Sequence, residues 1–200
     1  MKLRILALSA VLFAGTTFTH ANIIGNTLTN DSDGVLACYT YGFTQTGQTD
    51  FQLSIDGVHH RFEPGDILGN IYTDTELDPS LTLNHSIDND TGIDWTDYHV
   101  EITLNKSFTI TAATVDSPWT YAITAPSLIG SSWIGSVDYY GPANPILAGG
   151  TLNFGYTMNF TGSVAFSEQL TPTSVPEPAT FAVVLCGLAG LFILQRRLSV

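Results

Sequence analysis

Four aspartates stand close together near the middle of the chain and could coordinate a cation. Asp88, Asp90, Asp94 and Asp97 lie within ten residues, and Ca²⁺ takes about six to eight oxygen ligands. The segment is not an EF-hand loop, because Gly92 comes one position early and no glutamate closes the loop. Asp and Asn are also typical of ordinary turns, where they bond to the local backbone. We expect a structural turn here, with a Ca²⁺ site as the alternative.

A second group of residues could bind a sugar. The segment 126–150 is rich in Gly, Ser and Pro and contains Trp133, Tyr139 and Tyr140. Rings presented by such a loop can stack on sugar faces, whereas buried aromatic rings usually fill a core. Two interpretations are therefore open: sugar stacking by these three rings, or rings that fill one end of the fold.

Signals for catalysis are weak, and we predict no catalytic residue and no enzyme activity. The chain contains no G-x-S-x-G, H-E-x-x-H, P-loop or C-x-x-C pattern. His59 and His60 are adjacent, so their side chains should point to opposite faces of a strand. We expect His85 and His99 to be exposed on the polar sides of alternating strands. Two nearby carboxylates would suffice for a glycosidase, but spacing along the chain does not reveal such a pair.

The region 22–174 is strongly acidic. It contains 17 Asp and Glu residues against two basic residues, Arg61 and Lys106, which is a formal charge of −15. Such a surface repels nucleic acids and anionic membranes. It could attract divalent cations or basic partners, or serve only solubility. Cys38 is the one cysteine of this region. We expect it to be a small buried hydrophobic residue, and we predict no cofactor other than the Ca²⁺ alternative.

The first 21 residues are typical of a signal peptide. Lys2 and Arg4 form a positive start, and an apolar run of ten residues follows from Ile5 to Ala14. Thr19-His20-Ala21 places small residues at the −3 and −1 positions of a cleavage site. The apolar run is too short to span a bilayer. We therefore expect export through the Sec translocon and cleavage by signal peptidase.

The last 26 residues combine a proline motif, an apolar run and a basic end. Val175-Pro176-Glu177-Pro178 should be extended and accessible, because each proline fixes φ and removes a backbone donor. The 16 residues from Ala179 to Leu194 carry no charge. As a helix they would span roughly 24 Å, slightly less than a hydrocarbon core of about 30 Å. Arg196 and Arg197 would then remain in the cytoplasm.

This tail resembles the sorting domain of PEP-CTERM proteins, which Gram-negative bacteria export and a membrane-embedded exosortase processes. The resemblance implies exosortase as a partner, an inner-membrane intermediate, and a final location at the cell surface or outside the cell. It also implies association with exopolysaccharide in biofilm. The segment from Asp88 to His99 is similar to a stretch in some ectodomains of this family. That similarity implies a turn whose Trp95 anchors the loop to the core.

The region between the two targeting segments shows the period-two alternation of β-strands. The predicted strands cover 35–43, 51–56, 67–72, 81–87, 98–104, 108–115, 119–123, 152–160 and 164–170. Clusters of Gly, Asn, Asp and Pro separate them. We predict an all-β fold, an antiparallel and jelly-roll-like β-sandwich at 22–174, between a signal peptide at 1–21 and a sorting tail with a transmembrane helix at 175–200.

Two functions of different classes are consistent with these features. The first is a non-catalytic surface or matrix protein that is exported, processed by exosortase and associated with exopolysaccharide. The second is a carbohydrate-binding or glycoside-cleaving module with the same sorting tail. An exposed set of rings, or a pair of carboxylates in a cleft, would favour the second.

Overall fold

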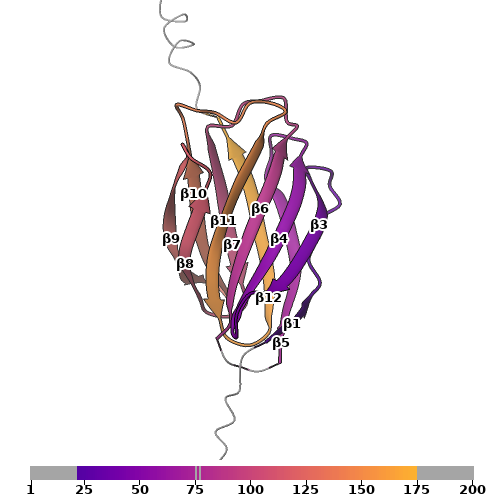
Figure 1. The fold of residues 1–200 in the computed structure, drawn as a ribbon, viewed down its shortest axis with the longest axis vertical. Coiled ribbons are helices and arrows are strands. Elements are labelled where there is room, and N and C mark those ends of the chain that lie inside the picture. The colour runs from indigo at the N-terminus through magenta and orange to yellow at the C-terminus, as the bar shows by residue number, and fades with distance from the viewer. Residues whose placement is uncertain (1–21, 75, 77, 175–200) are drawn as a thin grey trace, which may run out of the picture.

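The protein is a β-sandwich of two sheets packed face to face (Figure 1). The structure is a computed structural model and describes residues 22–74, 76 and 78–174. The strands are β1 (Ile23–Asn26), β2 (Thr29–Asn30), β3 (Leu36–Gln45), β4 (Asp50–His59), β5 (Gly65–Thr73), β6 (Ser80–Asn89), β7 (Asp97–Leu104), β8 (Phe108–Val115), β9 (Thr120–Ile129), β10 (Ser132–Tyr140), β11 (Thr151–Phe160) and β12 (Val164–Thr173). The predicted all-β class is confirmed, and each predicted range overlaps a strand.

The predicted signal peptide and sorting tail lie outside the described residues. Within the described part of the chain, no helix is long and apolar enough to cross a membrane. The expected transmembrane helix at 175–200 therefore stays a prediction.

One sheet has seven strands and the other has five. The seven-stranded sheet has the order β1-β5-β12-β7-β10-β9, with β2 also paired to β5, and the five-stranded sheet has the order β3-β4-β6-β11-β8. All of these pairs are antiparallel except β4 with β6, which is parallel. This corrects the purely antiparallel prediction. The reason is that β5 lies between β4 and β6 in the chain but belongs to the opposite sheet, so the chain returns in the same direction.

Alternating apolar residues build the core between the sheets. In β4, Phe51, Leu53 and Ile55 are buried while their neighbours are partly exposed. The same alternation holds in β6, β7 and β12. One face of each sheet is therefore packed and the other faces solvent, as the period-two pattern predicts.

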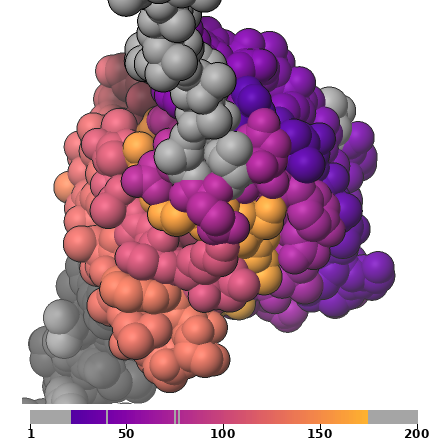
Figure 2. Space-filling model, turned by 90° about the horizontal axis from the view of Figure 1, so that it is seen from below, coloured from indigo at the N-terminus to yellow at the C-terminus, as the bar shows by residue number. Residues whose placement is uncertain are grey.

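The segment 126–150 is not one loop. It contains the end of β9, the two-residue turn Gly130-Ser131 and all of β10. Gly130 has a φ of +63°, a left-handed conformation that glycine adopts without strain. The β9–β10 hairpin, in salmon, forms a projecting edge of the molecule in Figure 2. Frequent Gly and Ser concealed the alternation in the sequence.

Candidate functional site

The segment from Asp88 to Asp97 is a turn organised by one buried side chain. Asn89 is fully buried. Its Oδ1 accepts hydrogen bonds from the Thr91 backbone N–H at 3.1 Å and the Thr91 hydroxyl at 2.7 Å. Its Nδ2 donates to the carbonyl oxygens of Ile93 and Ile146 at 2.9 and 3.0 Å. Asn89 thus closes the turn and ties it to the segment that precedes β11.

Trp95 anchors the other half of this turn. Its side chain is fully buried, and its indole N–H donates to the Thr91 hydroxyl at 3.2 Å. The backbones of Trp95 and Ile146 exchange two hydrogen bonds of 2.9 and 2.8 Å. Gly92 has a φ of +75°, which allows the chain to reverse there. The predicted role of Trp95 as an anchor to the core agrees with this geometry.

The four candidate Ca²⁺ ligands do not converge. Asp88 accepts from the Thr151 hydroxyl, Asp90 contacts His60, and Asp94 accepts from the Ala148 backbone N–H. Burial raises the pKa of Asp97, and the nearby Asp138 raises it further. Among the described residues no group of three or more His, Cys, Asp or Glu side chains is placed to hold a metal ion. The segment is a structural turn, as expected, and in the described residues its aspartates are directed to separate neighbours rather than to a common point.

The predicted stacking trio is not formed. Tyr139 is fully buried, and its hydroxyl donates to the Gly155 carbonyl at 2.8 Å. Trp133 is partly buried and packs against the core. Tyr140 is 38% exposed, because adjacent residues of a strand point to opposite faces. The three rings therefore cannot contact one sugar together.

His85 is buried, contrary to expectation. It shares its strand parity with Leu83 and Ile87 in β6, and this parity faces the core. Its Nε2 lies 3.1 Å from Glu168 Oε2, and both side chains are 0% exposed. The imidazole stacks on Phe154 with ring centroids 4.6 Å apart. The exposure of His99 is intermediate, 36% for its side chain, and it contacts Asp138.

The surroundings of the His85–Glu168 pair are closed and unreactive. Glu168 Oε1, His85 Nδ1 and the Tyr156 hydroxyl have no hydrogen-bond partner among the described residues. Burial raises the pKa of Tyr156 well above its usual value and raises the pKa of the Cys38 thiol to about 11. A thiol with that pKa carries almost no thiolate at neutral pH. We therefore assign this cluster to the core rather than to catalysis.

His59 and His60 point to opposite sides, as predicted. His59 is fully buried, with Nδ1 at 3.0 Å from the Tyr98 hydroxyl and Nε2 at 2.8 Å from the Glu63 carbonyl. Burial lowers its pKa. His60 is exposed and contacts Asp90 at 3.0 Å. Of these two histidines, only His60 is therefore accessible to a ligand.

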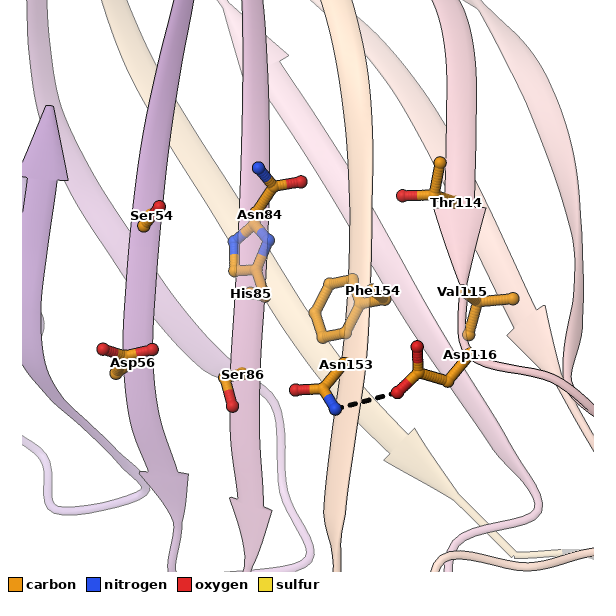
Figure 3. Close-up of a pocket in the computed structure, with 10 residues that line it drawn as sticks. All are labelled: Ser54, Asp56, Asn84, His85, Ser86, Thr114, Val115, Asp116, Asn153 and Phe154. Carbon is orange, nitrogen blue, oxygen red and sulfur yellow. Dashed lines mark hydrogen bonds between the residues drawn. The ribbon is translucent and has the colours of Figure 1, made fainter. Parts of the chain in front are cut away.

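A polar hollow of about 360 Å³ lies on the outer face of the five-stranded sheet (Figure 3). Its walls come from β4, β6, β11 and the end of β8. The lining residues are Ser54, Asp56, Asn84, His85, Ser86, Thr114, Val115, Asp116, Asn153 and Phe154. Asn153 Nδ2 donates to Asp116 Oδ2 at 2.8 Å. Asp56 and Asp116 are separated by three strand spacings, roughly 14 Å. This distance exceeds the roughly 5 to 9.5 Å between the carboxylates of glycosidases.

A second hollow of about 480 Å³ adjoins the first along the strands, and it contains an exposed ring. Tyr39 is 65% exposed, because a β-bulge between Cys38 and Thr40 turns it to the outer face. The other walls of the hollow are Val58, His60, Asp88, Asn89, Asp90, Gly149 and Thr151. The sequence does not reveal this site, since nothing in the alternation of β3 indicates a bulge.

Comparisons with known proteins add no assignment. The chain matches no protein-family model, no curated protein and no solved structure. Its function must therefore be inferred from its residues and their geometry.

Proposed function

We propose that the chain is an exported, non-catalytic protein of the cell surface or extracellular matrix, processed by exosortase and associated with exopolysaccharide. The observation that carries this proposal is the sorting motif Val175-Pro176-Glu177-Pro178, followed by an uncharged run and Arg196-Arg197. The signal peptide features of residues 1–21 support export. The acidic β-sandwich with a closed core supports a domain that is displayed rather than one that turns over a substrate.

The motif can be tested by substitution in a host that has an exosortase. Replacing Pro176-Glu177-Pro178 with three alanines should leave the sandwich folded and prevent processing, so that mass spectrometry finds the Arg196-Arg197 end on the protein. Pro142→Ala, at an exposed proline of the folded body, is the matched control and should be processed normally. Processing of the triple variant at the normal rate would refute the proposal.

A second candidate function is binding of a sugar chain, and the exposed Tyr39 beside two adjoining polar hollows favours it. An exposed ring can stack on a sugar, and carboxylates such as Asp56 and Asp88 accept hydrogen bonds from sugar hydroxyls. With a formal charge of −15 over residues 22–174, the surface would repel anionic sugars. The expected ligand is therefore a neutral or amine-bearing polysaccharide.

Retardation of the full chain in gels that contain a neutral glucan, a chitosan or an alginate tests this second function. Tyr39→Ala should abolish retardation, while Tyr140→Ala, which removes an exposed ring elsewhere, should not. Retardation by alginate alone would contradict it.

Asp56 and Asp88 occupy diagonal positions on neighbouring strands, about 7–8 Å apart. They are the first pair to substitute if the chain releases reducing sugars.

A further inference from the structure

Asn22 is held at the start of β1 by a single carboxylate. Its backbone N–H donates to Asp74 Oδ1 and its side-chain Nδ2 donates to Asp74 Oδ2, each at 2.8 Å. The Asp74 N–H donates in return to the Asn22 carbonyl oxygen at 3.0 Å. Asp74 directly follows β5, the strand that pairs with β1 (Figure 1). Three hydrogen bonds therefore join two residues that lie 52 positions apart in the sequence.

The position of the Asn22 nitrogen is set by contacts with the folded body. The next residue, Ile23, is 5% exposed, belongs to the core and pairs with Thr73 of β5. These contacts lie on the C-terminal side of the nitrogen, so they do not depend on what precedes Asn22 in the chain. Cleavage of the bond before Asn22 would therefore leave its nitrogen facing the same carboxylate.

Asp74 is an anion that is bonded here by uncharged groups. The side-chain and backbone hydrogen bonds from Asn22 lower the pKa of Asp74, so its carboxylate is ionised at neutral pH. The nearby Glu76 has a cation of its own, because Lys106 Nζ lies 3.2 Å from Glu76 Oε2. A positive charge on the nitrogen of Asn22 would provide Asp74 with the same kind of partner.

We propose that Asp74 anchors the α-ammonium group that cleavage after Ala21 creates at Asn22. Signal peptidase hydrolyses the Ala21–Asn22 bond: water supplies a hydroxyl group to the Ala21 carbonyl carbon and a proton to the Asn22 nitrogen, and the amine takes a further proton from solvent. The bond to Asp74 Oδ1 then joins an ammonium group to a carboxylate. Its length of 2.8 Å already suits such a charged bond, which is roughly twice as strong as a neutral one. The inference rests on the export step of the proposed function.

The anchor is specific for one cleavage position. A cut one residue earlier leaves the Asn22 nitrogen in a peptide bond, without charge. A cut one residue later removes Asn22 together with its three hydrogen bonds. The small residues Thr19 and Ala21 indicate the same position from the sequence. The leader and the folded body thus point to one bond independently.

Amine labelling of the protein isolated from an exporting host tests the proposal. Mass spectrometry should find Asn22 as the first residue. An acylating reagent reacts with the uncharged amine, which at about pH 7.5 coexists with the ammonium form, because an α-amino group has a usual pKa of about 7.7–8.0. Asp74 stabilises the ammonium form, so Asp74→Asn should speed acylation of Asn22 about twofold. The acylation rate of Lys106 in the same sample is the internal reference.

Asp78→Asn is the matched control. Asp78 is an exposed carboxylate of the same acidic stretch, but it accepts from the Thr161 hydroxyl at 2.6 Å. This variant should be labelled at Asn22 as the wild type is. A first residue other than Asn22, or equal rates in the wild type and Asp74→Asn, would overturn the proposal.

Salt dependence keeps the test decisive if Asp74→Asn does not fold. The Asn22–Asp74 bond is exposed, and salt screens exposed charges: the Debye length falls from about 30 Å at about 0.01 M to about 3 Å at about 1 M. Acylation of Asn22 in the folded wild type should therefore be faster in high salt, and a rate independent of salt would contradict the anchor. A protein that begins at Asn22 but fails these labelling tests would overturn the anchor and leave export intact. A chain that keeps residues 1–21 would overturn both.

Discussion

The two histidine–carboxylate pairs formed by His85 with Glu168 and by His99 with Asp138 differ mainly in their surroundings. The first joins atoms 3.1 Å apart, and both side chains are 0% exposed. The second joins atoms 2.5 Å apart, and its side chains are 36% and 38% exposed. The shorter contact is the one that water and salt screen. Burial, rather than distance, should therefore decide what the loss of each pair costs.

The largest expected effect is on the buried pair. Glu168→Ala leaves His85 without its partner inside the core and should lower the free energy of unfolding by about 3–5 kcal/mol. Asp138→Ala, the matched substitution in the exposed pair, should cost less than about 1 kcal/mol. Urea denaturation of both variants measures the difference. Equal losses would show that burial does not determine how much stability each pair contributes.

A double substitution sharpens the same comparison. Replacing His85 and Glu168 together with leucine removes both polar groups from the core, so no partner is left unpaired. Well-packed apolar replacements of a buried pair are often neutral or stabilising by about 1–4 kcal/mol. The double variant should therefore recover most of the stability that Glu168→Ala loses. If it is as unstable as the single variant, the pair adds stability to the core beyond the avoidance of an unpaired polar group.

The interior and the surface can also be compared through two asparagines. Asn89→Ala removes four hydrogen bonds from a fully buried side chain and should cost about 1–3 kcal/mol. Asn153→Ala removes one exposed bond to Asp116 and should change stability by less than about 0.5 kcal/mol. Thermal unfolding followed by circular dichroism checks both values. A comparable loss in Asn153→Ala would contradict this ranking.

The smallest expected effect concerns pH. Burial lowers the pKa of His59 below 6.5, so the unfolded chain takes up a proton at a higher pH than the folded protein. The free energy of unfolding is therefore greatest above about pH 6.5, and it decreases as the pH falls from there towards the pKa of His59 in the folded protein. In His59→Gln, stability should therefore change less over this range than in the wild type. An unchanged slope in chemical denaturation at several pH values would count against it.

Much of the fold could be predicted from alternation, and the failures have physical causes. β10 was missed because Gly135 and several serines interrupt its apolar positions. His85 was expected to be exposed because histidine is polar, although it shares its parity with Leu83. Strand parity was the better guide, since period two fixes the face on which a side chain lies whatever its type.

The candidate sites were less predictable than the strands. The four aspartates between residues 88 and 97 are close in sequence, but the turn directs each to a different neighbour. Conversely, Tyr39 and His60 line the same hollow from separate segments. A β-bulge brings Tyr39 there, and a bulge leaves no clear sign in the local pattern.

The sequence by itself determined the all-β class, most of the strands, the turn at Gly92 and the expectation of export and sorting. These features depend on local properties: side-chain parity, turn-forming residues and the length of apolar runs. Only the tertiary structure decided that His85 meets Glu168, 83 residues away, that β4 and β6 run parallel, and that β9 remains exposed on both faces. Those outcomes depend on sheet order and register, which hydrogen bonds and packing between distant strands establish together.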